Sequence, residues 1–154
     1  MCRSARQFAD LDESRPDLRA RCRHALLRGL EHRQCDQSIR SAREAKWAAG
    51  SLAVSVIRDA DRAFWTRTVW RDEGAMRAFM RSGVHRRVMA HLPEWCDEAA
   101  LAHWVQEANE PPSWAEAHRR LQQEGRRSRV NHPTAAQRRF EIREPRVSTG
   151  LTFK

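Results

Sequence analysis

The hydrophobic pattern predicts three strands in the middle of the chain. Apolar and β-branched side chains stand on both faces of the first two, so each of these strands is expected to be covered on both sides. The polar link between them is typical of a hairpin. The third strand alternates between a face with a histidine and a face with a tryptophan. The predicted strands are residues 51–57, 63–70 and 97–105.

Segments whose apolar residues follow helical spacing lie before and after these strands in the sequence. Residues 17–50 favour helix, with Gly50 as the stop, although residues 18–27 fit either a strand or a helix. Asp72 is placed to cap a helix whose apolar side chains follow the 3.6-residue period. A second short helix is expected to end before Pro93.

The C-terminal third reads as an attachment to this core. Ser113 and Glu116 form a capping box for a helix that should end near Gly125. From residue 126 onward there is little periodic apolar content, which predicts a mobile or loosely docked tail. The expected organisation is a leader (1–16), an α+β domain (17–105), a linker and helix (106–125) and a basic tail (126–154).

The net charge of +9 belongs mostly to the end of the chain. Residues 50–105 carry eight basic and seven acidic side chains, whereas residues 119–154 carry ten basic and three acidic ones. Such a tail can attract polyanions in a salt-sensitive, sequence-blind manner. A specific nucleic-acid function is not expected.

The composition indicates a soluble, cytoplasmic protein. No apolar run approaches the roughly 20 residues that span a bilayer, and acidic residues follow the N-terminus where a secretory signal would carry an apolar stretch. The four cysteines show no repeated spacing and are expected to be reduced thiols.

Several short motifs resemble one family of proteins. The motifs are Phe64-Trp65-Thr66 through Trp70, Met76-Arg77-Ala78-Phe79-Met80, Ser82-Gly83-Val84-His85-Arg86, Trp95-Cys96-Asp97-Glu98-Ala99 and His103-Trp104. They are similar to an uncharacterised bacterial branch related to the antibiotic-biosynthesis-monooxygenase type of dimeric α+β barrel. The likeness covers roughly residues 34–132, and the branch has no established reaction to carry over.

This resemblance implies a ferredoxin-like α+β sandwich of the dimeric barrel type, here with an extra C-terminal helix and a basic tail. Two protomers would pack sheet against sheet as a homodimer, and each would keep a pocket for a small hydrophobic molecule between sheet and helices. Family members also open with a strand before the first helix. The segment 17–30 of this chain is only weakly strand-like.

Two residues are candidates for proton transfer. His85 follows Gly83 at a helix break, where an imidazole could act as a general acid or base or as an axial haem ligand, or could simply fix the helix join. Glu98 enters an apolar strand, where a carboxylate could act as a base. The structural alternative for Glu98 is an ion pair with Arg67 or Arg86.

Four further residues are candidates for binding a substrate. Trp65 and Trp104 could wall a flat aromatic molecule or could fill the core. Phe79, with helical core spacing, and His103 are assigned to the same pocket. Cys and His spacings fit no metal centre, so no metal and no bound cofactor is expected, and haem has no specific motif.

The leading hypothesis is therefore a monooxygenase-like enzyme for a hydrophobic or aromatic small molecule, without a tightly bound metal. In related folds the substrate supplies the electrons, so the protein needs only to desolvate, orient and move a proton. One alternative is a non-catalytic dimeric protein that binds a hydrophobic ligand. The other is a polyanion-binding protein that works through its arginine-rich tail.

Overall fold

A six-stranded antiparallel sheet organises the computed structural model, which describes residues 20–29 and 32–153. The leader predicted over residues 1–16 lies outside this part of the chain. The strands follow the order β5-β4-β1-β3-β2-β6. They are β1 (Ala20–Arg28), β2 (Ser51–Asp59), β3 (Phe64–Trp70), β4 (Glu98–Gln106), β5 (Arg126–Arg127) and β6 (Val147–Phe153).

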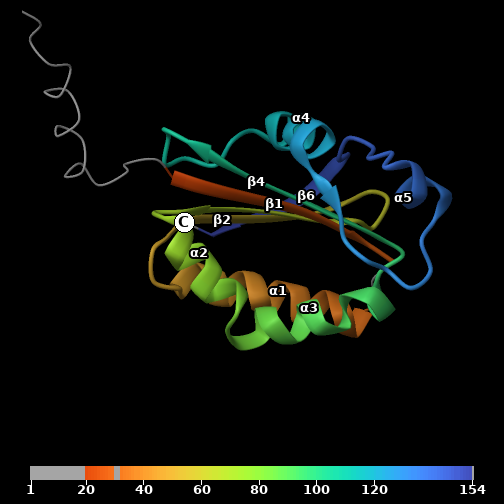
Figure 1. Cartoon of the computed structure of the whole chain (residues 1–154), viewed down its shortest axis with the longest axis horizontal. Coiled ribbons are helices and arrows are strands. Elements are labelled where there is room, and N and C mark those ends of the chain that lie inside the picture. The colour runs from red at the N-terminus through yellow and green to blue at the C-terminus, as the bar shows by residue number, and fades with distance from the viewer. Residues whose placement is uncertain (1–19, 30–31, 154) are drawn as a thin grey trace, which may run out of the picture.

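Helices cover both faces of the sheet. Figure 1 shows α1, α2 and α3 below it and α4 above it. The four inner strands, in the order β4-β1-β3-β2, have the ferredoxin-like arrangement, and the predicted α+β fold class is confirmed. The helices are α1 (His32–Trp47), α2 (Glu73–Met80), α3 (Gly83–Trp95), α4 (Trp114–Glu124) and α5 (Ala135–Arg139).

The segment before α1 corrects the expectation of a helix over residues 17–50. Residues 20–28 form β1, which pairs with β3 on one side and β4 on the other. Leu26 packs into the core on one face of the sheet and Leu27 into the core on the other. Pairing and burial on all sides thus override the weak local preference, as is common for central strands. The opening strand implied by the family resemblance is present.

The helix after β3 begins as predicted. Asp72 accepts a hydrogen bond from the Ala75 amide at 2.7 Å and so caps α2. The next helix differs from the prediction, because α3 continues through Pro93 to Trp95. The Pro93 carbonyl accepts a hydrogen bond from Asn131, which ties this irregular last turn to the chain beyond β5.

The helix α4 covers the second apolar face of the strands. Ala117 and Leu121 of α4 are fully buried against this face, where Trp65 and Trp104 form the centre of the core. The family resemblance implies that a partner protomer packs on this face. In the structure, α4 of the same chain covers it, so the apolar face requires no second copy.

Local contacts hold α4 in this position. Ser113 accepts a hydrogen bond from the Glu116 amide at 3.1 Å, which confirms the predicted N-cap. The Glu116 carboxylate binds arginines of its own helix instead of reaching back to the cap. From β3, the Arg67 guanidinium lies 4.1 Å from the centroid of the Trp114 ring and also donates to the Pro112 carbonyl.

The C-terminal segment also differs from the expected mobile tail, because it docks on the sheet. The strand β6 pairs with β2 and forms one edge of the sheet. The buried Gln137 side chain accepts a hydrogen bond from the Ala99 amide and donates to the Ala99 and Ser128 carbonyls. Ile142 is buried in the α4-side core. Gln137 and Ile142 are single buried residues at irregular spacing, so hydrophobic periodicity does not predict that this segment docks.

Candidate functional site

A cavity lies between the sheet and the helices α1 and α3. Its volume is about 50 Å³, enough for a few water molecules at roughly 10–15 Å³ each. Most of its wall is apolar, with side chains from β1, β2, β3, α1 and α3. The cavity occupies the position that the family resemblance implies for a pocket.

His85 is the chemically distinctive residue of this cavity. It lies in the first turn of α3 and is only 4% exposed. Its Nδ1 atom is 3.2 Å from Ser41 Oγ of α1, and which atom donates depends on the imidazole tautomer. The Phe79 ring packs against the imidazole with a centroid separation of 4.8 Å, and Phe79 in turn stacks on Trp70. The imidazole is therefore held on two sides.

Hydroxyl groups provide the other polar atoms of the wall. They belong to Ser38, Ser41, Thr66, Thr68 and Ser128. Among the described residues that line the cavity, His85 alone has an ionisable side chain, and none is a carboxylate, lysine or arginine. The cavity thus suits a neutral, mostly apolar molecule with a hydroxyl or carbonyl group, and it offers one group that can accept a proton.

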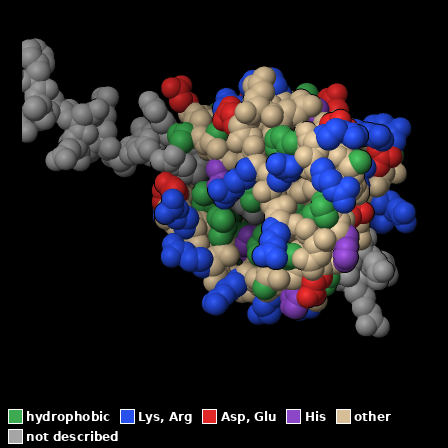
Figure 2. Space-filling model, turned by 45° about the vertical axis from the view of Figure 1, so that its right-hand side comes forward, with side chains coloured by type: hydrophobic (Ala, Val, Ile, Leu, Met, Phe, Trp, Pro, Cys, Tyr) green, Lys and Arg blue, Asp and Glu red, His purple; other side chains and the backbone are tan. Residues whose placement is uncertain are grey.

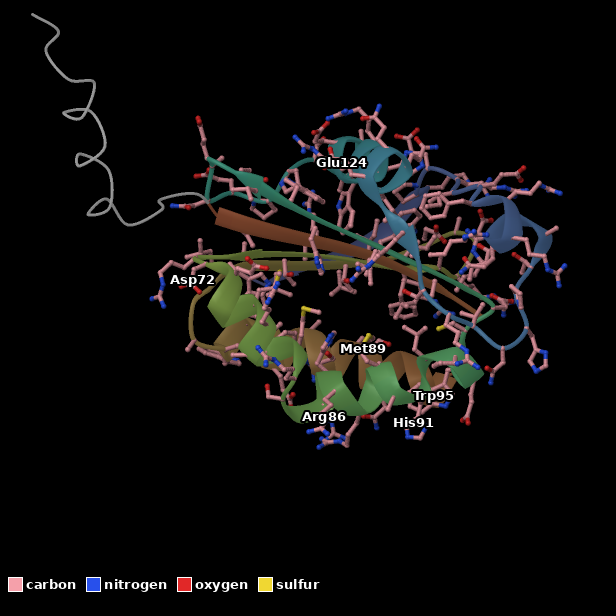
Figure 3. All side chains as sticks on the ribbon, in the orientation of Figure 1. Asp72, Arg86, Met89, His91, Trp95 and Glu124 are labelled. Atoms are coloured by element: carbon pink, nitrogen blue, oxygen red, sulfur yellow. The ribbon has the colours of Figure 1, made fainter. Side chains whose placement is uncertain are left out.

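One flexible side chain forms part of the cavity wall. Met89 lines it and is partly buried. Figure 3 shows Met89 directed from α3 toward the sheet, whereas Arg86 and His91 lie on the outer side of the same helix. An unbranched thioether changes conformation at little cost, so this part of the wall can adapt to a ligand.

The two predicted aromatic walls lie on the other face of the sheet. Trp65 is fully buried and donates a hydrogen bond from Nε1 to Asp59 Oδ2 at 2.8 Å. Trp104 packs in the same core, with the Arg120 guanidinium 5.5 Å from its ring centroid. Both tryptophans therefore pack under α4 and do not face His85. For Trp65 this position follows from strand alternation, which puts its side chain on the face opposite Thr66 and Thr68.

The remaining sequence candidates divide between the cavity and its surroundings. Phe79 lines the cavity beside His85. His103 does not line the cavity, although Ala100 and Leu101 of the same strand do. Glu98 forms an ion pair with Arg28 at 3.1 Å and accepts a hydrogen bond from Thr134 at 2.7 Å. The partner arginine therefore differs from the two considered in the sequence.

The residues that sequence analysis missed belong mainly to α1. Ser38, Ser41, Ala42 and Ala45 all line the cavity. Their spacing of i, i+3, i+4 and i+7 marks one face of a helix. Small side chains leave room between a helix and a sheet. This stripe of small residues on a predicted helix was therefore the sequence signal for a cavity next to α1.

No metal centre emerges from the described part of the chain. Residues 20–29 and 32–153 contain no group of three or more His, Cys, Asp or Glu side chains that could hold a metal ion. The cavity at His85 is also much smaller than a porphyrin requires. Within the same residues, no helix is long and apolar enough to cross a membrane.

Cys96 is a free, buried thiol at the junction of α3 and β4. Burial raises its pKa to about 12, and the neighbouring Asp97 charge adds to the increase. The thiol therefore stays protonated around neutral pH, and we expect iodoacetamide at about pH 8 to modify Cys96 at least about 100-fold more slowly in the folded than in the urea-unfolded protein. Peptide mass spectrometry would measure this, and equal labelling rates would contradict the burial of Cys96.

Comparison with known proteins assigns the chain to a protein family. Residues 38–146 match a family model described as "Domain of unknown function (DUF3291)". This match covers more than half of the chain, and the chain therefore belongs to the DUF3291 family. The family resemblance derived from the sequence motifs is thus confirmed. No curated protein matches the chain.

Solved structures agree on the fold. The chain is similar to the NE2512 protein of unknown function from Nitrosomonas europaea, with a TM-score of 0.51, 15% identity, and coverage of 62% of this chain and 97% of that one. A conserved protein from Methanosarcina mazei Go1 gives a TM-score of 0.50, 16% identity, and coverage of 56% and 92%. These likenesses define the fold and say nothing of chemistry.

A third similar structure is SnoaB, a cofactor-independent oxygenase from Streptomyces nogalater. Its TM-score is 0.45 with 15% identity, and the match covers 60% of this chain and 94% of SnoaB. An oxygenase is therefore among the proteins of similar fold, but this level of similarity carries no argument about the activity of this chain.

Proposed function

We propose that this protein is a small oxygenase that removes a proton from a neutral hydroxyaromatic molecule held against His85. One observation supports the proposal: the buried His85 imidazole lies beside Ser41 in a cavity whose other described wall residues are uncharged and mostly apolar. In such a site a general base can contribute about 10²- to 10⁴-fold to a reaction rate. The hydroxyls of Thr66 and Ser128 offer hydrogen-bond partners for the oxygen atoms of the molecule.

Hydroquinone illustrates the reaction class. His85 accepts the proton of one hydroxyl group, and the resulting electron-rich ring reacts with O₂. One oxygen atom enters the ring and the other leaves as water, which gives 2-hydroxy-1,4-benzoquinone. The substrate supplies all four electrons, so the chemistry balances without a further reductant. The protein contributes desolvation, orientation and proton transfer.

The strands β1, β2 and β3 and the helices α1 and α3 of one protomer supply most of the described cavity wall. The homodimer that the family resemblance implies stays a prediction. Binding of a ring requires the cavity to widen beyond its present 50 Å³, and displacement of Met89 is the simplest way. The proposal keeps the cytoplasmic location expected from the sequence.

Oxygen consumption tests the proposal directly. We expect the purified protein to accelerate oxygen uptake by hydroquinone above the uncatalysed rate and to form the hydroxylated quinone, as measured with an oxygen electrode and mass spectrometry in ¹⁸O₂. Incorporation of one ¹⁸O atom per product is the predicted result. Hydroquinone binding with no extra oxygen uptake would instead support the non-catalytic binding protein.

The arginine-rich tail gives less support to the polyanion alternative. Several of its arginines are paired with acidic side chains: Arg119 and Arg120 with Glu116, Arg139 with Glu141, and Arg146 with Asp61. Figure 2 shows Lys and Arg side chains scattered over the visible face rather than gathered in one patch. We therefore do not propose polyanion binding as the function.

A further inference from the structure

The helix that carries His85 begins without help from its own N-cap residue. Ser82 precedes α3, but its side chain makes no capping hydrogen bond and instead donates to the Phe79 carbonyl of α2 at 3.1 Å. The amides in the first turn of a helix have no partner within the helix. They must find one elsewhere or remain exposed to water.

Glu44 of α1 provides this partner from 40 positions earlier in the chain. Its Oε2 atom accepts a hydrogen bond from the Val84 amide at 2.8 Å. Val84 immediately precedes His85, and a carboxylate at this end of a helix also interacts favourably with the helix dipole. The contact therefore joins the N-terminal turn of α3 to α1 next to the proposed proton acceptor.

Gly83 is matched to this contact. Its φ angle is +56°, and a Cβ atom at this position would lie 2.5 Å from Glu44 Oε2. Any larger residue would be strained and would also displace the carboxylate. The sequence thus leaves space at residue 83 for the side chain that comes from α1.

The same face of α1 makes a second contact with this turn. Ser41, three residues before Glu44 and hence on the same side of the helix, lies 3.2 Å from His85 Nδ1. One contact holds the backbone of the turn and the other holds the imidazole ring. Together they fix the position of His85 relative to α1, whose small residues form part of the cavity wall.

We infer that Glu44 is a positioning residue for His85: it replaces the missing N-cap of α3 and thereby orients the imidazole in the cavity. The contacts are independent of any reaction, while the importance of the orientation rests on the proposed function. Glu44 touches no substrate in this assignment. It acts only through the first turn of α3.

The test compares Glu44→Ala with Glu44→Gln, which keeps an acceptor oxygen without the charge. Glu94→Ala, at the far end of α3, is the matched control. In Glu44→Ala we expect hydrogen exchange of the Val84 amide to become about tenfold faster, as for a lost cap, and the ¹⁵N imidazole signals of His85 to shift or broaden. Glu44→Gln should restore both readouts, and Gly83→Ala should reproduce the effects of Glu44→Ala.

These measurements need no substrate, so failure of hydroquinone oxidation does not affect them. Faster Val84 exchange with unchanged His85 signals would overturn the positioning role and leave Glu44 as a helix cap only. No change in either signal would overturn the cap as well. Equal effects in Glu94→Ala would assign the changes to a general loss of stability of α3 and would also overturn the inference.

Discussion

Replacing His85 with glutamine is expected to lower the rate of hydroquinone oxidation by about 10²- to 10⁴-fold, the usual contribution of a general base. Among the described residues of the cavity wall, no other side chain can accept a proton near neutral pH. Glutamine keeps a polar group beside Ser41, so hydroquinone affinity should change much less than turnover. Steady-state oxygen uptake and calorimetric titration under argon would separate the two effects.

His91→Gln is the matched control for this prediction. His91 lies on the same helix, but on its outer side, where it stacks on Trp95 and has a side chain that is 54% exposed. Its replacement should leave oxidation unchanged. If His85→Gln retained the turnover of the original protein, the assignment of the base would be wrong, even if the cavity bound hydroquinone.

Replacing Leu121 with aspartate is expected to detach α4 and to destabilise the protein by several kcal/mol, because it places a charge in a fully buried site. Leu121 packs in the same core as Trp65 and Trp104, so loss of α4 exposes a wide apolar face of the sheet. Such faces associate. We therefore expect a lower urea midpoint together with larger species in light scattering than the original protein forms.

Leu52→Asp controls for the introduction of a charge at a leucine. Leu52 is 44% exposed at the start of β2, so the same substitution should change stability and association little. A dimeric original protein whose association does not respond to Leu121→Asp would contradict the role of α4 as the cover of this face. It would favour the homodimer implied by the family resemblance, formed through another surface.

The regular part of the fold could be predicted because alternation and helical spacing are local properties. The strand β3 illustrates this: alternation alone puts Trp65 and Val69 on the face opposite Phe64 and Trp70, and the two pairs belong to separate cores in the structure. The strand β1 could not be derived from local pattern. Its strand conformation depends on pairing with β3 and β4, which are distant in sequence.

Only part of the cavity wall can be predicted from the sequence. A histidine after a glycine at a helix break is a local signal that singles out His85, and helical spacing singles out Phe79 nearby; both line the cavity. Whether an aromatic side chain faces the cavity or the opposite core depends on which helices cover each face. The sequence predicts the helix α4 but does not show which face of the sheet it covers. Trp65 and Trp104 were therefore proposed to bind the substrate, although they pack under α4. Ser41 was missed because its role depends on a contact with a residue 44 positions away.

The most direct measurement is a crystal structure of the protein with hydroquinone, prepared without oxygen. We expect the ring to lie between α1, α3 and the sheet, with one hydroxyl oxygen within hydrogen-bonding distance of the His85 imidazole, about 2.6–3.2 Å. Met89 should be displaced relative to the protein alone. Hydroquinone bound at another surface, with the His85 cavity unchanged, would show that this cavity is not the substrate site.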